Sequence, residues 1–198
     1  VWTCTYTETE TGDVSEVKST GKNASFYLKD TNAEKGGLLK AENGTGIKAE
    51  GQSDNMLTAF ANIKANIEAD EGVNANIYGK IVIEEGTIKG KGCGIRVGDT
   101  GSLDVYGGTI EATGTGIIYG ENGFSTPVEM NIYGGTIKGG KNGVEILPNS
   151  KAEINAYIVA GIIQGDEYGL KTDKYEATCT LTGGTIKGKT AAINGEVT

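Results

Sequence analysis

The stretch Gly86-Thr87-Ile88-Lys89-Gly90 decides the fold, because close variants of it recur four more times along the chain. The later copies occupy residues 108–112, 135–139, 161–165 and 184–188. Their first glycines follow one another at steps of 22, 27, 26 and 23 residues, by subtraction of the residue numbers. A repeat of this length indicates a solenoid or another repeat architecture.

Each copy of this motif is followed by a second apolar position, seven residues after its central residue. These second positions are Ile95, Ile117, Val144, Leu170 and Ile193. The first four follow a glycine, whereas the last follows Ala192. Four of the motifs are also preceded by a third apolar segment, at residues 81–83, 103–106, 130–133 and 179–182. The repeat therefore contains three short strands separated by turns that carry Gly, Asn and Asp.

Strands this short, with alternating apolar residues, cannot form a helical repeat. We therefore predict an all-β fold, a right-handed parallel β-helix (β-solenoid) with three short strands in each coil of 22–27 residues. Stacked coils would bury one apolar column made of Ile88, Ile110, Ile137, Ile163 and Ile186. The predicted β-helix domain spans residues 13–198 and follows an N-terminal strand at residues 1–12, which is a candidate for donation to a neighbouring subunit.

The first half of the chain follows the same pattern less regularly. Leu39 and Ile47 are eight residues apart, which indicates one inserted residue in the turn between them. Met56 comes nine residues after Ile47 and is expected at the position that Cys179 holds in the last coil. Residues 55–62 have an alternative interpretation as a turn of helix, and the pattern does not decide between the two.

The composition argues against two kinds of partner. The net charge is −8, with no histidine and a single arginine, Arg96. Nucleic acid and anionic membrane surfaces both attract proteins with a basic face. No apolar run approaches the roughly 20 residues of a membrane-spanning helix. We therefore expect no nucleic-acid partner and no membrane insertion.

The predicted localisation is extracellular or at the cell surface. The chain begins at Val1 rather than at methionine, which indicates a processed mature product or a cut piece. Abundant Thr, Asn and Gly, the acidic balance and the solenoid pattern favour a secreted or surface protein. Asn23 and Asn43 lie in the sequences Asn-Ala-Ser and Asn-Gly-Thr, which match the glycosylation sequon.

Over residues 36–198 the coil pattern resembles the architecture of the pectin-lyase-like superfamily, many of whose members cleave polysaccharides. The resemblance implies a parallel β-helix. Its hydrolases are known for clustered Asp pairs, a Gly-His-Gly and an Arg-Ile-Lys, and none of these occurs in this sequence. Its lyases use Arg or Lys beside carboxylates that hold calcium, whereas Arg96 stands alone at an outward strand position. We therefore predict that the protein is not an enzyme and has no cofactor.

Other chemistry has weak support in the sequence. The carboxylate pairs Asp99/Asp104 and Glu84/Glu85 could serve as acid and base in a glycosidase only if they met in a cleft. The turns 70–72 and 98–101 lack the ordered spacing of calcium ligands, so no metal site is predicted. A Thr column at residues 87, 109, 136 and 185 permits an ice-binding interpretation, but the neighbouring outward column mixes Lys and Glu, which argues against a weakly hydrated plane.

The two ends of the chain fit together in sequence. Joined tail to head, residues 193–198 and 1–7 reproduce the frame of residues 170–182, with nine residues from the apolar position to the cysteine in both cases. This continuity predicts a head-to-tail homopolymer in which the N-terminal strand of one copy completes the last coil of another. The alternative is that this strand pairs with its own first coil.

The predicted subunit interface contains residues from both ends: Val1, Trp2, Cys4, Tyr6, Cys179, Leu181, Ile193, Val197 and Thr198. Across such a joint Cys4 and Cys179 would lie on adjacent rungs, which permits an intersubunit disulfide, with two buried thiols as the alternative. Cys93 lies in a Gly-rich turn of a central coil, has no partner in this scheme and is expected to stay reduced.

The favoured function is a structural subunit of an extracellular filament or surface fibre, with copies of itself as partners. The alternative is a β-helical adhesin or carbohydrate-binding surface module, which would have surface glycans as ligands and could be one unit of a tandem-repeat chain. Tyr106 and Tyr133 occupy equivalent positions, so we expect their rings to stack, and stacked aromatic rings can bind sugars or another filament.

Overall fold

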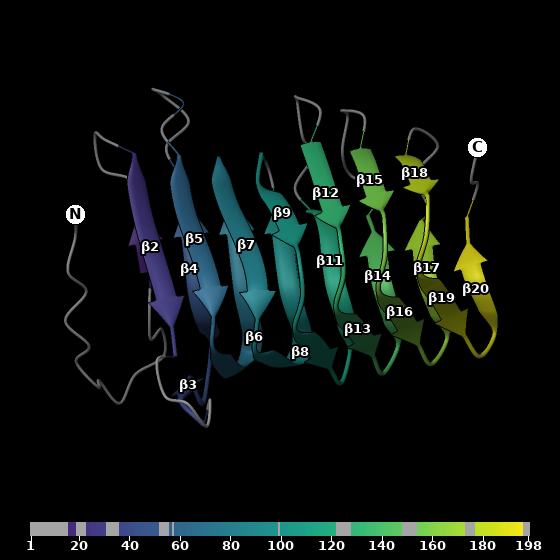
Figure 1. Cartoon of the computed structure of the whole chain (residues 1–198), viewed down its shortest axis with the longest axis horizontal. Helices are drawn as coiled ribbons and strands as arrows, with labels where there is room; N and C mark the ends of the chain where they lie inside the picture. Colours follow the sequence, from purple (N-terminus) through teal and green to yellow (C-terminus); the bar gives the residue numbers. More distant parts are fainter. Residues whose placement is uncertain are drawn as a thin grey trace.

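The protein is a parallel β-solenoid, seen here in a computed structural model. The structure describes residues 16–18, 23–30, 36–51, 56, 58–98, 100–121, 128–147, 154–172 and 177–195. The described residues form twenty strands and no helix, so none of them forms a helix that could cross a membrane. Successive coils lie side by side along the long axis, with the purple strand β2 and the yellow strand β20 at opposite ends (Figure 1). The predicted all-β solenoid is confirmed.

Each coil passes through three faces in turn, and all strand pairs within a face are parallel. Face 1 contains β2 (Ala24–Lys29), β5 (Ala59–Lys64), β7 (Gly79–Glu85), β9 (Ser102–Val105), β12 (Val128–Ile132), β15 (Ile154–Ile158) and β18 (Ala177–Leu181). Face 2 contains β3 (Leu38–Lys40), the first halves of β6 (Asn66–Asn76) and β8 (Thr87–Gly98), β10 (Thr109–Ala112), β13 (Thr136–Gly139), β16 (Ile162–Gly165) and β19 (Thr185–Gly188). Face 3 contains β1 (Glu16–Lys18), β4 (Thr45–Glu50), the second halves of β6 and β8, β11 (Thr115–Glu121), β14 (Asn142–Ile146), β17 (Tyr168–Thr172) and β20 (Ala191–Asn194).

The predicted isoleucine column on face 2 is confirmed. The strand register places Ile67, Ile88, Ile110, Ile137, Ile163 and Ile186 on successive coils. All but the last of these are 0 or 1% exposed. Burial of each such side chain contributes roughly 1.5–3 kcal/mol relative to leaving it in water. The stack of coils, rather than any single coil, therefore forms the hydrophobic core.

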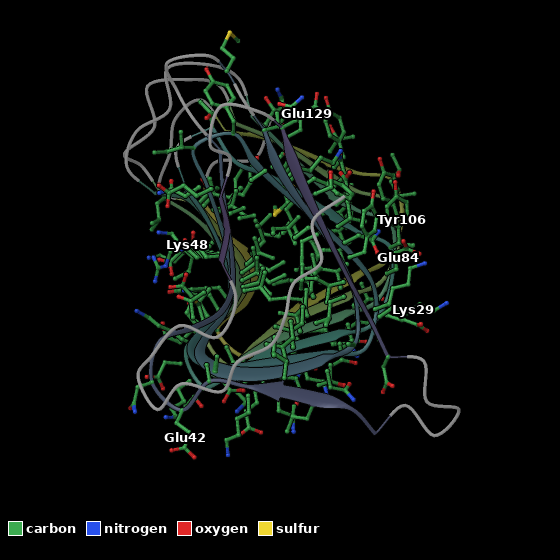
Figure 2. All side chains as sticks on the ribbon, turned by 90° about the vertical axis from the view of Figure 1, so that its left-hand side faces the viewer. Lys29, Glu42, Lys48, Glu84, Tyr106 and Glu129 are labelled. Atoms are coloured by element: carbon green, nitrogen blue, oxygen red, sulfur yellow. The ribbon has the colours of Figure 1, made fainter. Side chains whose placement is uncertain are left out.

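The other two faces contribute further inward columns. On face 3 one column reads Ile47, Val73, Ile95, Ile117, Val144, Leu170 and Ile193. On face 1 one column reads Phe26, Ala61, Ile81, Leu103, Met130, Ala156 and Cys179. Viewed along the axis, apolar side chains fill the interior while Lys48, Glu84 and Glu129 point outward (Figure 2).

Glycine is required at the corner between faces 1 and 2. The glycine that opens each sequence motif has a φ between 80° and 97°, as in Gly86, Gly108 and Gly161. This left-handed conformation is costly for residues that have a Cβ atom. The backbone conformation of this turn therefore requires glycine at the first position of the motif.

A second glycine column, on face 3, is required by packing instead. Its members are Gly46, Gly72, Gly94, Gly116, Gly143 and Gly169. A Cβ atom added at any of these positions would lie less than 3.0 Å from Cγ2 of the face 2 isoleucine of the next coil. The glycine in front of each second apolar position therefore makes room for the isoleucine column. In the last described coil, Ala192 takes this place.

One expectation for the first half of the chain is wrong, and one alternative that the sequence left open is decided. Met56 is 68% exposed, has a φ of 52°, and lies outside the strand. The face 1 strand β5 begins at Ala59, and the position of Cys179 is held in that coil by Ala61. Residues 59–62 are accordingly strand rather than helical turn. The physical reason is that two small alanines at Ala59 and Ala61 fill the inward positions there, both fully buried.

Candidate functional site

The last described coil, made of β18, β19 and β20, leaves its core residues uncovered on one side. Leu181 on β18 is 49% exposed, whereas Ile158, its neighbour on the preceding coil, is 1% exposed. Ile186 and Ile193 are only partly buried, although their interior counterparts are 0 or 1% exposed. This coil therefore presents an apolar end to the solvent, which we call the C-terminal end face.

The backbone at the C-terminal end face is also open. Within the described part of the chain, β18 pairs with β15, β19 with β16 and β20 with β17, each on one side only. The other edge of each strand has no partner among the described strands, and such an edge can accept a strand from another chain. The end face thus combines hydrogen-bonding edges with apolar side chains.

A ladder of alternating charge runs along the outside of face 2 and ends at this coil. Its members, in register, are Lys40, Glu68, Lys89, Glu111, Lys138, Gln164 and Lys187. Ion pairs join Lys40 to Glu68 at 3.3 Å and Lys138 to Glu111 at 3.4 Å. Near the end face the alternation changes, because the ladder neighbour of Lys187 is the uncharged Gln164.

The predicted interface residues divide between described and undescribed parts of the chain. Cys179, Leu181 and Ile193 lie together on the last coil, as expected. Val1, Trp2, Cys4, Tyr6, Val197 and Thr198 lie outside the described residues. The thiol of Cys179 is partly buried, and this burial raises its pKa. Cys93 is a fully buried thiol at the corner within β8, several coils away.

The carboxylates considered for acid and base chemistry on face 1 take part in ion pairs. Asp104 is 8% exposed, accepts a hydrogen bond from Asn131 at 2.8 Å and pairs with Lys80 at 2.9 Å. Glu84 points outward (Figure 2), where Lys64 pairs with it at 2.5 Å and Asn62 donates a hydrogen bond at 2.7 Å. The hydrogen bond from Lys64, followed by that from Asn62, lowers the pKa of Glu84. Glu85 is half-buried, and Asp99 lies outside the described residues.

In the first of the two turns considered for calcium, residues 70–72, the carboxylates are likewise paired with basic side chains. Lys91 pairs with Asp70 at 2.7 Å, and its hydrogen bond is the largest cause of the lowered pKa of Asp70. Arg96 donates to Glu71 at 2.8 Å, and Asn74 donates to the other carboxylate oxygen at 2.5 Å. Among the described residues, no three His, Cys, Asp or Glu side chains gather as a metal site would require.

The sequence did not single out a similar network on face 3, centred on Glu145. Lys171 donates to this carboxylate at 2.9 Å, and Asn142, which is fully buried, donates at 3.0 Å. Burial acts to raise the pKa of Glu145, but these two hydrogen bonds, together with the positive charges of Lys171 and Lys141, hold the pKa below its usual value. The repeat could have predicted this ion pair, because Lys171 occupies the position of Glu145 in the next coil. These contacts join neighbouring coils and do not face a cleft.

Tyr106 and Tyr133 form the expected stack, with ring centroids 4.8 Å apart and an interplanar angle of 16°. They are 54% and 40% exposed, and Tyr106 projects outward from face 1 (Figure 2). Because the rings lie against each other on successive coils, the faces that they share cannot stack on a sugar. Tyr157 and Val159, also exposed, follow on the next coil.

Both sequon asparagines are exposed. Asn23 accepts a hydrogen bond from the backbone of Thr58 through Oδ1, at 3.0 Å, and Asn43 lies in the turn before β4. Their positions leave both side chains at the surface of the first coils.

No protein-family model matches this sequence, and neither the curated proteins nor the solved structures contain a significant match.

Proposed function

We propose that the protein is a structural subunit of an extracellular filament or surface fibre, whose copies polymerise head to tail by stacking of solenoids and addition of the N-terminal strand. The observation that carries the proposal is the C-terminal end face, where Leu181 is 49% exposed and the strand edges are open. Such an edge is an aggregation hazard that natural solenoids cover. A second copy of the chain is the occupant whose sequence continues the repeat.

The connector in this proposal is the N-terminal segment 1–12. Trp2, Cys4 and Tyr6 alternate with threonines, so an extended chain would place the three larger side chains on one face. Cys4 stands in the same Thr-Cys-Thr frame as Cys179. The segment would then add the face 1 strand of the coil that follows β20.

The experiment that tests the proposal is a mass measurement on the native assembly in denaturant with reductant. Separate units near 20.5 kDa support self-assembly of individual chains. A single very long chain would instead mean covalent tandem repeats. An assembly that does not form at any concentration of purified chain would contradict the proposal.

The second candidate is a β-helical adhesin or carbohydrate-binding surface module. The exposed tyrosines Tyr106 and Tyr133 favour it, because surface aromatic residues are enriched at recognition sites. Binding of a soluble glycan that is lost in Tyr106→Ala, with assembly unchanged, would support this candidate. The stacking of these two tyrosine rings on each other makes it the weaker of the two.

We predict a disulfide bond between subunits, from Cys4 of one copy to Cys179 of the next. On adjacent rungs Cys4 and Cys179 would be about 4.8 Å apart at Cα, within the usual disulfide range of about 4.4–6.8 Å. Non-reducing electrophoresis of denatured filaments should give a ladder that collapses to monomer with reductant and disappears in Cys4→Ser. Because burial raises the pKa of Cys179, oxidation should accelerate as the pH rises.

The control for the intersubunit disulfide is Cys93→Ser. This variant should leave the band pattern of the non-reducing gel unchanged, because the Cys93 thiol is buried inside β8. Monomer in both reducing and non-reducing lanes would refute the disulfide and leave two thiols at the joint.

We also predict no cleavage of polysaccharides. The expectation rests on the absence of histidine from the chain and on the ion pairs that occupy Asp104 and Glu84. Purified protein should release neither reducing ends nor unsaturated uronides from a panel of polysaccharides. Saturable release that is lost on mutating one Asp or Glu would overturn this prediction.

A further inference from the structure

We infer that the joint between subunits is selected by charge: the last coil recognises the acidic N-terminal segment of another copy through Lys187. This inference rests on the proposed head-to-tail assembly and adds a specific recognition element to it. The described residues of the last coil, 177–195, contain two lysines and no acidic residue, and Glu176 and Glu196 flank them in the sequence. The segment 1–16 contains four acidic residues and no basic one.

The charge ladder on face 2 supports this assignment. From Lys40 to Lys138 every rung faces a neighbour of opposite charge, and such cross-strand pairs stabilise the register. Lys187 faces Gln164 on its inner side, so a carboxylate on its outer side would restore the alternation. Lys189, the other lysine of this coil, already pairs with Asp166 at 3.0 Å. Lys187 is therefore the residue that an acidic partner would contact.

The ladder also argues against direct stacking of one described solenoid on another. The first described face 2 strand is β3, whose outward residue is Lys40. Placing it next to β19 would bring Lys40 opposite Lys187, and like charges on adjacent rungs are destabilising.

An acidic rung between these two strands removes the repulsion. In the sequence, Glu8, Glu10 and Asp13 follow the alternating residues Trp2, Cys4 and Tyr6 and precede the face 3 strand β1. In all the remaining coils, a face 2 strand lies at this point in the chain, between the face 1 strand and the face 3 strand. The acidic residues of one copy would thus bridge Lys187 of its neighbour and Lys40 of its own chain.

The test is charge reversal on both sides of the joint, in the full chain and under reducing conditions. Lys187→Glu should raise the critical concentration for polymerisation roughly tenfold, since repulsion replaces attraction at the joint. The triple change Glu8→Lys, Glu10→Lys and Asp13→Lys should weaken assembly similarly. Combining both sets should restore part of the lost assembly, because the new lysines attract the carboxylate at position 187 while Lys40 of their own chain still repels them. The matched control is Lys138→Glu, the same reversal inside the ladder, which should leave polymerisation unchanged.

Sedimentation of filaments at about 0.05 M and 0.5 M NaCl gives a second readout, because salt screens exposed charges. High salt should weaken filament assembly of the original chain. It should also reduce the difference in critical concentration between the original chain and Lys187→Glu. If the original chain polymerises and Lys187→Glu assembles equally well, the charge inference is wrong and the head-to-tail assembly stands. If reversal on both sides does not restore assembly, the inference is equally wrong. If the original chain stays monomeric throughout, both fail.

Discussion

The substitution Ile137→Asp is expected to prevent folding. Ile137 is fully buried in the middle of the face 2 column, between Ile110 and Ile163. A carboxylate there has no partner, and burying it costs several kcal/mol of the about 5–15 kcal/mol that stabilises a typical domain. Circular dichroism and thermal unfolding should show loss of β structure or of a cooperative transition.

Two matched variants define how specific this effect is. Ile137→Val removes one methylene and should cost only about 0.5–1.5 kcal/mol. Ile186→Asp places the same charge in the same column at the C-terminal end face, where the side chain is only partly buried. Its effect on the monomer should be smaller. A soluble Ile137→Asp protein that melts cooperatively near the original temperature would contradict the column as the source of stability.

Deletion of residues 1–10 is expected to abolish filaments and yield monomers. The last coil of such monomers should be frayed, because its outer strand edges and the partly buried Ile193 would lack a covering strand. Sedimentation velocity measures the loss of assembly, and hydrogen exchange of β18, β19 and β20 measures the fraying.

Hydrogen exchange also shows which coil residues 1–10 pair with, the last coil of another copy or the first coil of their own chain. If residues 1–10 pair with their own first coil, their deletion should expose β2 and β3 and leave the last coil unchanged. A synthetic peptide of residues 1–16, added to the deleted protein, should protect the last coil in the proposed arrangement. Filaments of normal length from the deleted protein would exclude the segment as the connector.

Much of the fold could be predicted because each coil repeats the same constraints. The constant seven-residue step from the central isoleucine to the next apolar position predicted the pairing of Ile88 with Ile110 and of Ile95 with Ile117. Stacked coils turn such sequence spacing directly into strand register. The Tyr106 and Tyr133 stack followed from the same logic.

The errors arose where the spacing between strands varies. In the coil of β5 the chain reaches face 1 at Ala59, three residues after Met56, because a longer turn precedes the strand. Counting residues across a turn of variable length cannot place the next strand. The sequence also suggested separate short strands on faces 2 and 3, whereas β6 and β8 continue through the corner and join both faces into one sheet.

The candidate site could be predicted only in part, for a different reason. Cys179, Leu181 and Ile193 were expected at one end because they belong to the last repeat. The importance of Lys187 depends on which outward residue faces it one coil away, and Gln164 holds that position only through the register of β16 and β19. The repeat already indicated an outward column that mixes Lys and Glu, but the ion pairs along it became visible only once the strands were aligned.

The glycine column of face 3 has a consequence for how such a protein can change its length. Inside the solenoid, each glycine such as Gly143 admits the isoleucine of the following coil, so an interior coil can be duplicated and inserted between two others without steric conflict. Behind the last described coil, Ala192 carries the Cβ atom that the other positions lack. A duplicated coil with Ile on face 2 would meet that atom if it were appended there, unless Ala192 were first changed to glycine. A duplicated coil should therefore be tolerated between interior coils, whereas a coil placed behind Ala192 would need a smaller residue than isoleucine in the face 2 column.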